Sequence, residues 1–178
     1  MVIWIIGLSG SGKTTLSKLV YERLKPMMPT LVRLDGDIIR ELFGNDVDYS
    51  IEGRRKNAER LSRLSKFFAD QNISIIAAVL SIFPEWQKWN RNNIAEYAQV
   101  YLKASVDTLA RRDEKNLYIP AFQGRLKNVV GVDIAFPEPV NSDITIDNTG
   151  ERDNLGELAE QVISLPAAQE AILRCKRK

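Results

Sequence analysis

Short runs of apolar, largely β-branched residues recur along this chain, separated by longer segments of mixed polarity. Runs of this kind, bounded by glycine, proline or polar residues, are typical of strands that are buried on both faces of a parallel sheet. The pattern predicts strands at residues 2–6, 30–34, 74–79, 99–102 and 144–146.

The segments between these runs carry apolar residues at helical spacing. In the segment 13–25, for example, Leu16, Leu19, Val20 and Leu24 fall on one face, as expected for an amphipathic helix that packs on a sheet. Helices are predicted at 13–25, 37–43, about 53–71, around Trp86 and Trp89, and at 108–112, 155–163 and 167–178. We interpret the two tryptophans as packing residues rather than as a platform for a nucleotide base.

This alternation of strands and helices determines the predicted fold class. Strands joined through helices imply right-handed crossovers and a mostly parallel sheet that is covered on both faces. We therefore predict an α/β fold with three layers and a five-stranded sheet. The 178 residues suit a single domain, 1–178. Residues 114–142 show no clean periodicity, and a connection this long in a compact domain is often a functional lid.

The composition excludes several kinds of catalytic site and of binding partner. The chain has no histidine, which excludes a Ser-His-Asp triad and leaves acid–base work to carboxylates, lysines or tyrosines. Its single cysteine, Cys175, fits a reducing compartment. A net charge of +2 is too mild to indicate nucleic-acid binding, and we interpret the basic end at 174–178 as solvated. No apolar stretch reaches the ~20 residues of a membrane span, so we expect a cytoplasmic protein without a membrane partner.

The run from Gly7 to Thr14 matches the pattern G-x-x-x-x-G-K-[ST], and it follows a predicted strand and opens a predicted helix. Its glycines let the backbone N–H groups face phosphate oxygens at the helix N-terminus. Lys13 then reaches the β- and γ-phosphates, and the Thr14 hydroxyl is a ligand for Mg²⁺. The alternative, a glycine-rich turn with a chance Lys-Thr pair, does not require this context. The motif indicates ATP or GTP binding and leaves the acceptor open.

A second group of polar residues, Asp35, Asp37 and Arg40, follows the second predicted strand. Ligands of open α/β sheets bind beyond the carboxyl ends of the strands, so these side chains should face the same ligand as the glycine-rich loop. A carboxylate there can take a proton from an attacking hydroxyl or hold magnesium, and Arg40 can bind a phosphate or sulfate. The alternative is a turn with an Asp helix cap.

Four motifs together resemble the adenylyl-sulfate kinase family. They are the run Gly7 to Thr15, Leu34-Asp-Gly-Asp37, Arg112-Asp-x-Lys-x-Leu-Tyr118, and Gly131-Val-Asp133 followed by Pro137-Glu-Pro139. The resemblance spans roughly residues 2–150 in the family's order and spacing. It implies ATP and Mg²⁺ as cofactors and transfer of the γ-phosphate to the 3′-hydroxyl of adenylyl sulfate. Because members of the family often dimerise, it also suggests a second copy of the chain as a partner in a homodimer.

The resemblance also assigns roles to positions. Asp37 is implied near the acceptor hydroxyl and Asp35 at the metal with Thr14, with Lys13 completing the catalytic set. Residues 114–136 are implied as a lid that closes over both substrates. The implied ATP-binding residues are Gly7, Ser9, Gly10, Ser11, Gly12, Lys13, Thr14, Thr15 and Arg112, the last against the adenine. The implied acceptor-binding residues are Asp37, Arg40, Tyr49, Arg54, Asn57, Leu80, Ser81 and Val129, with Tyr49 stacking on the base.

The chain departs from the family's pattern on the acceptor side. Ile119-Pro120 stands where the family has two lysines, one of which helps hold the acceptor. The segment 128–131 reads Asn-Val-Val-Gly where the family has Gly-Phe-Thr-Gly, and 81–83 reads Ser-Ile-Phe where it has Ser-Pro-Tyr. Loss of the second aromatic suits a smaller base. Adenylyl sulfate remains the first expectation, with the family's branch that phosphorylates cytidine diphosphoramidate as the alternative.

Two further functions stay open. One is a kinase for a small sugar acid or a shikimate-like acceptor, which has no base to stack on Tyr49. The other is a nucleotide-binding module without catalysis, which the presence of Lys13, Thr14 and Asp37 disfavours. We interpret Arg55 and Lys56, between the implied acceptor residues, as part of a solvated helix face.

Overall fold

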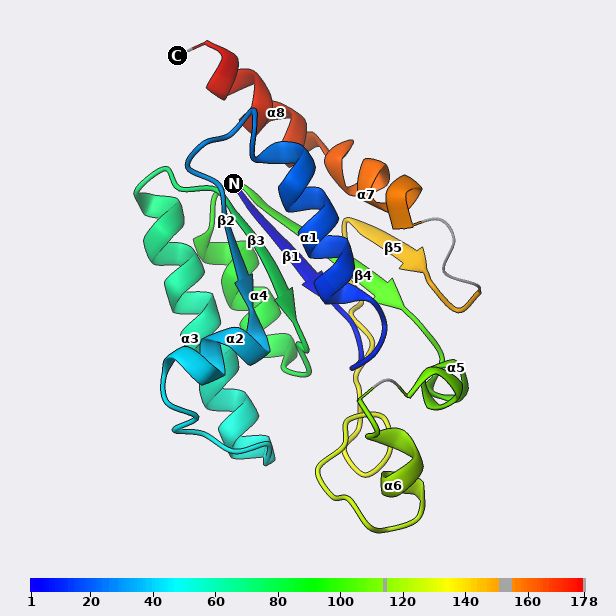
Figure 1. The fold of residues 1–178 in the computed structure, drawn as a ribbon. Coiled ribbons are helices and arrows are strands. Elements are labelled where there is room, and N and C mark those ends of the chain that lie inside the picture. Colours follow the sequence, from blue (N-terminus) through cyan, green and yellow to red (C-terminus); the bar gives the residue numbers. More distant parts are fainter. Residues whose placement is uncertain (114, 151–154, 178) are drawn as a thin grey trace.

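The computed structural model describes residues 1–113, 115–150 and 155–177, and shows one sheet with helices on both of its faces (Figure 1). All strand pairs are parallel, and the strand order is β2-β3-β1-β4-β5. The strands are β1 (Val2–Ile6), β2 (Val32–Asp35), β3 (Ile75–Val79), β4 (Tyr97–Lys103) and β5 (Ile144–Asp147). The predicted three-layer α/β fold with a five-stranded sheet is confirmed.

The helices follow the predicted sites closely. They are α1 (Lys13–Leu24), α2 (Gly36–Leu42), α3 (Ile51–Asp70), α4 (Pro84–Asn93), α5 (Val106–Arg112), α6 (Tyr118–Phe122), α7 (Leu155–Ile163) and α8 (Pro166–Lys176). Helix α5 begins earlier than predicted because the Ser105 side chain caps it by accepting a hydrogen bond from the Thr108 amide. Residue 178, at the end of the predicted last helix, lies outside the described residues.

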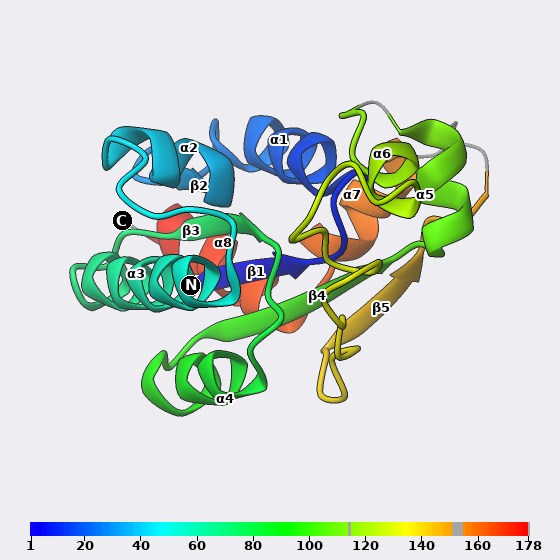
Figure 2. The ribbon, with the colours of Figure 1, turned by 90° about the horizontal axis from the view of Figure 1, so that it is seen from below.

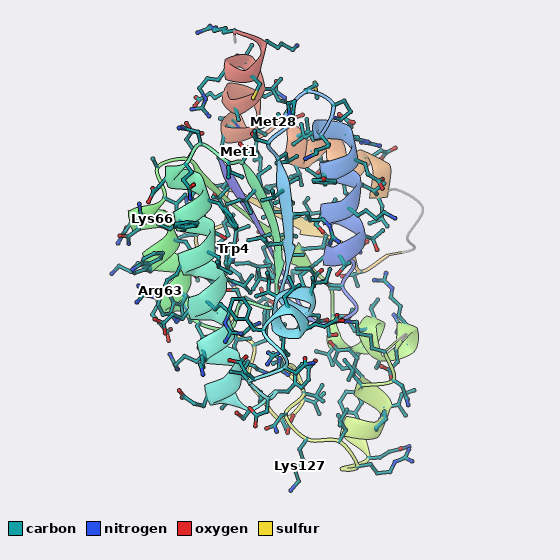
Figure 3. The ribbon with its side chains drawn as sticks, turned by 60° about the vertical axis from the view of Figure 1, so that its left-hand side comes forward. Met1, Trp4, Met28, Arg63, Lys66 and Lys127 are labelled. Atoms are coloured by element: carbon teal, nitrogen blue, oxygen red, sulfur yellow. The ribbon has the colours of Figure 1, made fainter. Side chains whose placement is uncertain are left out.

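The sheet is buried on both faces. Because side chains alternate along a strand, Ile3 and Ile5 of β1 face the layer of α1, α7 and α8, whereas Trp4 and Ile6 face the layer that contains α3 (Figure 2). All four are at most 1% exposed. On the outer face of α3, Arg63 pairs with a glutamate and Lys66 with an aspartate of the same helix, pointing away from Trp4 and the sheet (Figure 3).

Helix α6 is the one element that the sequence pattern missed. It lies in the segment that we predicted as irregular, and the Asp113 carboxylate caps it by accepting hydrogen bonds from three successive amides, those of residues 117, 118 and 119. Tyr118 and Ala121 of α6 join Val129 and Val130 in a third apolar cluster, which packs against Leu8 at the end of β1. The predicted lid is therefore packed onto the domain. Its first residue, 114, lies outside the described residues.

Several other sequence interpretations can be compared with this structure. Trp86 and Trp89 stack edge to face at 5.7 Å between ring centroids, and Trp86 packs on the third apolar cluster. Arg55 forms an ion pair with Glu85, and Lys56 is exposed. Among the described residues, no helix is long and apolar enough to cross a membrane.

Gly53 provides a test of the packing at the start of α3. A Cβ atom at this position would lie 2.4 Å from both the backbone oxygen and a carboxylate oxygen of Asp48. Gly53→Ala is therefore expected to lower the free energy of unfolding by roughly 1–3 kcal/mol, measured by urea denaturation. The matched control is Gly156→Ala in α7, where the nearest atom is the flexible end of Arg23 at 3.2 Å. Equal stability of the two variants would contradict this packing argument.

Candidate active site

A cavity of about 500 Å³ lies where β1, β2 and β3 end. This is the carboxyl edge of the parallel strands, where open α/β sheets bind ligands. Four parts of the chain surround it: the loop before α1, the segment from Asp35 to Leu61, residues 78–80 at the end of β3, and the predicted lid from Lys115 to Val130. The cavity therefore brings together residues that lie more than a hundred positions apart in the sequence.

The glycine-rich loop forms one wall of the cavity. Gly10 and Gly12 adopt positive φ angles of 75° and 97°, which only glycine takes without strain. Lys13 opens α1, and its Nζ donates to the Leu8 carbonyl at 2.6 Å. Burial, together with the charge of Lys115, lowers the pKa of Lys13 to about 8, although Asp35 and Asp37 oppose the shift. A partly buried lysine cation at a helix N-terminus is a strong attractor for phosphate.

Thr14 and Asp35 meet at the floor of the cavity. The Thr14 hydroxyl donates to an Asp35 carboxylate oxygen at 2.9 Å, and the second oxygen of Asp35 accepts the Asp37 amide at 3.0 Å. Arg33 lies 3.6 Å from the same carboxylate. Asp35 thus caps α2, as the alternative interpretation held, and also touches the residue predicted to hold the metal.

The oxygen atoms of Thr14 and Asp35 suit a magnesium ion. Mg²⁺ prefers oxygen ligands and is usually bound by one or two protein groups together with substrate phosphates and water. Among the described residues there is no group of three or more His, Cys, Asp or Glu side chains that could hold a metal ion alone. The residues present therefore fit a metal that arrives with a nucleotide, and Thr14 and Asp35 are the residues that would hold it.

Asp37 lies at the start of α2 and receives a hydrogen bond from the lid. Lys115 Nζ donates to its carboxylate at 2.8 Å, and both side chains are more than half exposed. Burial works against the charged form of Asp37. However, the hydrogen bond and charge of Lys115, with the charges of Lys13 and Arg40, hold the pKa of the carboxyl below its usual value. In the same pair, the Asp37 carboxylate outweighs burial and raises the pKa of Lys115.

Tyr49 and two arginines form the wall opposite the glycine-rich loop. Arg40 is 5% exposed and donates to the backbone oxygens of Val47 and Asp48 at 2.6 and 2.7 Å. Its guanidinium lies 4.5 Å from the centre of the Tyr49 ring, and that of Arg54 lies 5.4 Å away. Burial and the charge of Arg40 lower the pKa of Arg54. Two cations beside one aromatic ring form a surface for an anionic, ring-bearing ligand.

Arg54 also links this wall to the lid. It donates to the Tyr49 carbonyl at 2.8 Å and to the Asn128 carbonyl at 2.7 Å. Asn57, one helical turn further along α3, donates to the Gly36 carbonyl at 3.2 Å, while its own side-chain oxygen is buried without a partner. Lys127, near the tip of the lid, also lines the cavity, and its side chain extends away from the domain (Figure 3).

Most of the predicted site residues line this one cavity. They are Ser9, Gly10, Gly12, Lys13, Thr14, Thr15, Asp35, Asp37, Arg40, Tyr49, Arg54, Asn57, Leu80 and Val129. Four predicted residues do not line it: Gly7, Ser11, Ser81 and Arg112.

The local structure shows what these four residues do instead. A Cβ at Gly7 would lie 2.6 Å from the Leu102 carbonyl, so the glycine permits close packing on β4. Ser11 is fully buried, and Ser81 is 1% exposed with its carbonyl accepting from Gln87. Arg112 donates to the carbonyl of Gly150, beyond the end of β5. Their proposed ligand roles stay predictions.

Several described residues at the site were not predicted from the sequence, and three of them make hydrogen bonds that shape it. Lys115 reaches Asp37, the Tyr118 hydroxyl donates to the Ser9 carbonyl at 2.8 Å, and Asn148 donates to the Ser11 carbonyl at 2.8 Å. Lys115 and Tyr118 belong to a motif already noted in the sequence, so a signal for both was present. The chain lacks the family's lysines after Tyr118, and the lysine that contacts Asp37 precedes it instead. No pattern marked Asn148.

A parallel sheet with a Gly-x-x-x-x-Gly-Lys-Thr loop at the end of its central strand defines a P-loop nucleotide-binding fold. Within that class, the sequence matches the family model described as Adenylylsulphate kinase over residues 1–147. The chain belongs to this family of phosphotransferases, which confirms the resemblance on which the assigned roles were based.

Individual relatives differ in what they act on. The cytidine diphosphoramidate kinase of Campylobacter jejuni is 39% identical over 162 residues, which cover 91% of this chain and 94% of that protein. The adenylyl-sulfate kinase of Thermodesulfovibrio yellowstonii is 37% identical over 147 residues, covering 82% and 74%. The structure of the Mycobacterium tuberculosis APS kinase CysC in complex with AMPPNP and APS has a TM-score of 0.80 at 28% identity, covering 91% of this chain and 94% of that one.

Proposed function

We propose that this protein transfers the γ-phosphoryl group of ATP to the ribose 3′-hydroxyl of a nucleotide that carries an activated phosphate. The observation that carries the proposal is the single cavity in which Lys13 and Thr14 face Asp37, Arg54 and Tyr49. Lys13 and Thr14 suit a nucleoside triphosphate. The other three residues, Asp37, Arg54 and Tyr49, suit an anionic nucleotide with a hydroxyl to be activated. The relative from Mycobacterium tuberculosis, in complex with AMPPNP and APS, supports the same pair of substrate types.

The residues of this chain have distinct tasks in the transfer. Lys13 and the backbone amides of the glycine-rich loop stabilise the negative charge that spreads over the transferred oxygens. Asp37 orients the acceptor hydroxyl and takes its proton late in the transfer. Mg²⁺, bound with ATP beside Thr14 and Asp35, supplies further neutralisation of the phosphate charge. The lid excludes water, which would otherwise compete with the acceptor hydroxyl.

The acceptor that the cavity favours is a cytidine diphosphate derivative such as cytidine diphosphoramidate, ahead of adenylyl sulfate. Among the described residues that line the cavity, Tyr49 is the one aromatic, and Val129 occupies the family's second aromatic segment. A single stacking face suits a pyrimidine, which needs less contact than a purine. The 39% identity to the Campylobacter jejuni cytidine diphosphoramidate kinase over nearly the full length of both chains supports this choice.

An ADP-release assay with several acceptors tests this proposal. With ATP and Mg²⁺, we expect kcat/KM for cytidine diphosphoramidate to exceed that for adenylyl sulfate by at least about tenfold. Tyr49→Ala should raise the acceptor KM by roughly 5- to 100-fold, because one base stack is lost. The control variant is Phe67→Ala, which removes an exposed aromatic ring from α3 outside the cavity.

Each other outcome of that assay identifies a different function. Efficient turnover of adenylyl sulfate without turnover of the cytidine compound would overturn the acceptor assignment but keep the nucleotide kinase. Turnover of gluconate that is insensitive to Tyr49→Ala would point to a sugar-acid kinase. AMPPNP binding without ADP release for any of the acceptors would indicate a non-catalytic nucleotide-binding module.

A further inference from the structure

The glycine-rich loop has carbonyl groups that other parts of the chain hold in place. The Ser9 carbonyl accepts the Tyr118 hydroxyl at 2.8 Å, and the Ser11 carbonyl accepts the Asn148 side-chain amide at 2.8 Å. Tyr118 comes from α6 of the lid and Asn148 from the residue after β5, so the two donors lie 109 and 137 positions from their acceptors. Neither bond is part of the phosphate-binding motif.

Each of these two bonds determines the direction of the amide N–H that follows the bonded carbonyl in the loop. A peptide unit is planar and trans, so its N–H points opposite to its C=O. The Ser9 carbonyl shares a peptide unit with the Gly10 N–H, and the Ser11 carbonyl shares one with the Gly12 N–H. Fixing each carbonyl on the protein side of the loop therefore directs the following N–H away from that side. Gly10 and Gly12 both line the cavity.

The two peptide units that are held in this way are also the ones most able to rotate. Gly10 and Gly12 have φ angles of +75° and +97°, and glycine passes between positive and negative φ at little cost. If a carbonyl turned toward the cavity, it would present a negative dipole to the phosphates instead of an N–H donor. A loop that must bind anions with backbone amides therefore needs a restraint at these two positions.

Both donors are suited to act as restraints. Tyr118 is 2% exposed and Asn148 is 6% exposed, so water competes weakly for the bonds. Burial, with the charge of Asp113, also raises the pKa of Tyr118 far above neutrality, so its hydroxyl keeps the proton that it donates. The ring of Tyr118 is packed in the third apolar cluster, which keeps the hydroxyl in one place.

We propose that Tyr118 and Asn148 are positioning residues that set the Gly10 and Gly12 amides for the phosphates of ATP. They act through the loop and need no contact with the nucleotide. The inference rests on the proposed role of this loop in ATP binding. Through Tyr118 it also makes the lid a structural support of the donor site, in addition to its contact with Asp37 through Lys115.

Tyr118→Phe tests the proposal because it removes the hydroxyl and leaves the ring. We expect the Kd for AMPPNP with Mg²⁺, measured by calorimetry, and the KM for ATP to rise about three- to tenfold, with the acceptor KM unchanged within twofold. The matched control is Tyr97→Phe, which removes another buried hydroxyl that donates within the fold, to Gln99 at 3.0 Å and outside the cavity. That variant should lose similar stability in urea but keep wild-type AMPPNP affinity.

Asn148→Ala is the second, independent variant, and it should also weaken AMPPNP binding at least threefold. If the wild-type protein binds AMPPNP and both variants bind it with unchanged affinity, the inference is wrong. Equal loss of affinity in Tyr118→Phe and Tyr97→Phe would also overturn it, because the effect would then follow general stability. If the wild-type protein itself does not bind AMPPNP, the proposed function fails, and the inference fails with it.

Discussion

Lys13→Ala is expected to reduce kcat by on the order of 10²- to 10³-fold and to weaken ATP binding as well. Lys13 is the cation at the start of α1, beside loop glycines that line the same cavity. Its Nζ now donates to the Leu8 carbonyl, a bond that phosphate oxygens can replace. Because negative charge accumulates on the transferred group, the loss of this cation should affect the transition state more than the ground state. ADP release and AMPPNP titration measure the two effects.

The pH dependence of nucleotide binding gives a second signature of Lys13. Burial, then the charge of Lys115, lowers the pKa of this amine to about 8. Below that pH Lys13 is a cation and attracts phosphate, whereas above it the free protein increasingly holds a neutral amine. AMPPNP affinity should therefore fall as the pH rises above about 8, by up to about tenfold per unit. In Lys13→Ala this dependence should be absent.

Lys103→Ala is the control for both measurements. Lys103 is a lysine at the end of β4 that pairs with Glu138 at 3.0 Å outside the cavity. Its replacement should leave kcat and the pH profile unchanged. A Lys13→Ala enzyme with wild-type turnover, or one that keeps the loss of affinity above pH 8, would show that another group supplies the cation.

The ATP-binding half of the site, formed by the glycine-rich loop and the start of α1, could be predicted because its sequence signals are local. The spacing of Gly7, Gly12 and Lys13 and the flanking strand and helix lie within one short stretch of sequence. Likewise, Asp35 is the last residue of β2 and Asp37 lies two residues later. Because the sheet is parallel, the end of β2 lies at the same edge of the sheet as the glycine-rich loop. Continuous apolar runs and helical spacing also predicted the layers, because strands buried on both faces leave such runs.

The lid could not be predicted in the same way because its order depends on tertiary contacts. Helix α6 has five residues and includes Pro120, so it shows no helical periodicity, and it depends on the Asp113 cap. The pair Lys115–Asp37 joins residues 78 positions apart. The bond from Asn148 to Ser11 spans 137 positions, and Asn148 belongs to no motif recognised in the sequence. Contacts over such separations leave no local pattern that a single sequence could reveal.

In the proposed mechanism, one carboxylate, Asp37, lies between the two substrates. It follows Asp35, which is committed to Thr14 and to the cap of α2, and it contacts Lys115 of the lid. Among these groups, Asp37 is the one whose partner is a half-exposed side-chain cation at the cavity surface. An acceptor phosphate could take over Lys115, which would leave the carboxylate beside the acceptor hydroxyl. Asp37 is therefore the residue whose replacement should separate chemistry from ATP binding.

Asp37→Asn is expected to lower kcat by about 10²- to 10⁴-fold, the range for loss of a positioned general base. The amide keeps the size of the side chain but cannot accept the hydroxyl proton. Lys115 holds the pKa of Asp37 low despite burial, so the wild-type carboxylate is ionised at neutral pH and ready to accept. AMPPNP affinity should change by less than about threefold, because Thr14, Asp35 and Lys13 remain. Single-turnover assays with saturating ATP measure the chemical step directly.

Asp46→Asn is the matched control for this variant. Like Asp37, Asp46 is a carboxylate that pairs with a cation, in this case Arg60 at 2.6 Å. It lies in the loop before α3 and does not line the cavity. Its replacement removes an ion pair and a negative charge of the same kind, and turnover should stay within about twofold of wild type. Unchanged turnover in Asp37→Asn would remove this carboxylate from the mechanism. A parallel loss of AMPPNP affinity and turnover would instead place Asp37 in the ATP-binding half of the site, because the replacement would then act on ATP binding as well as on transfer.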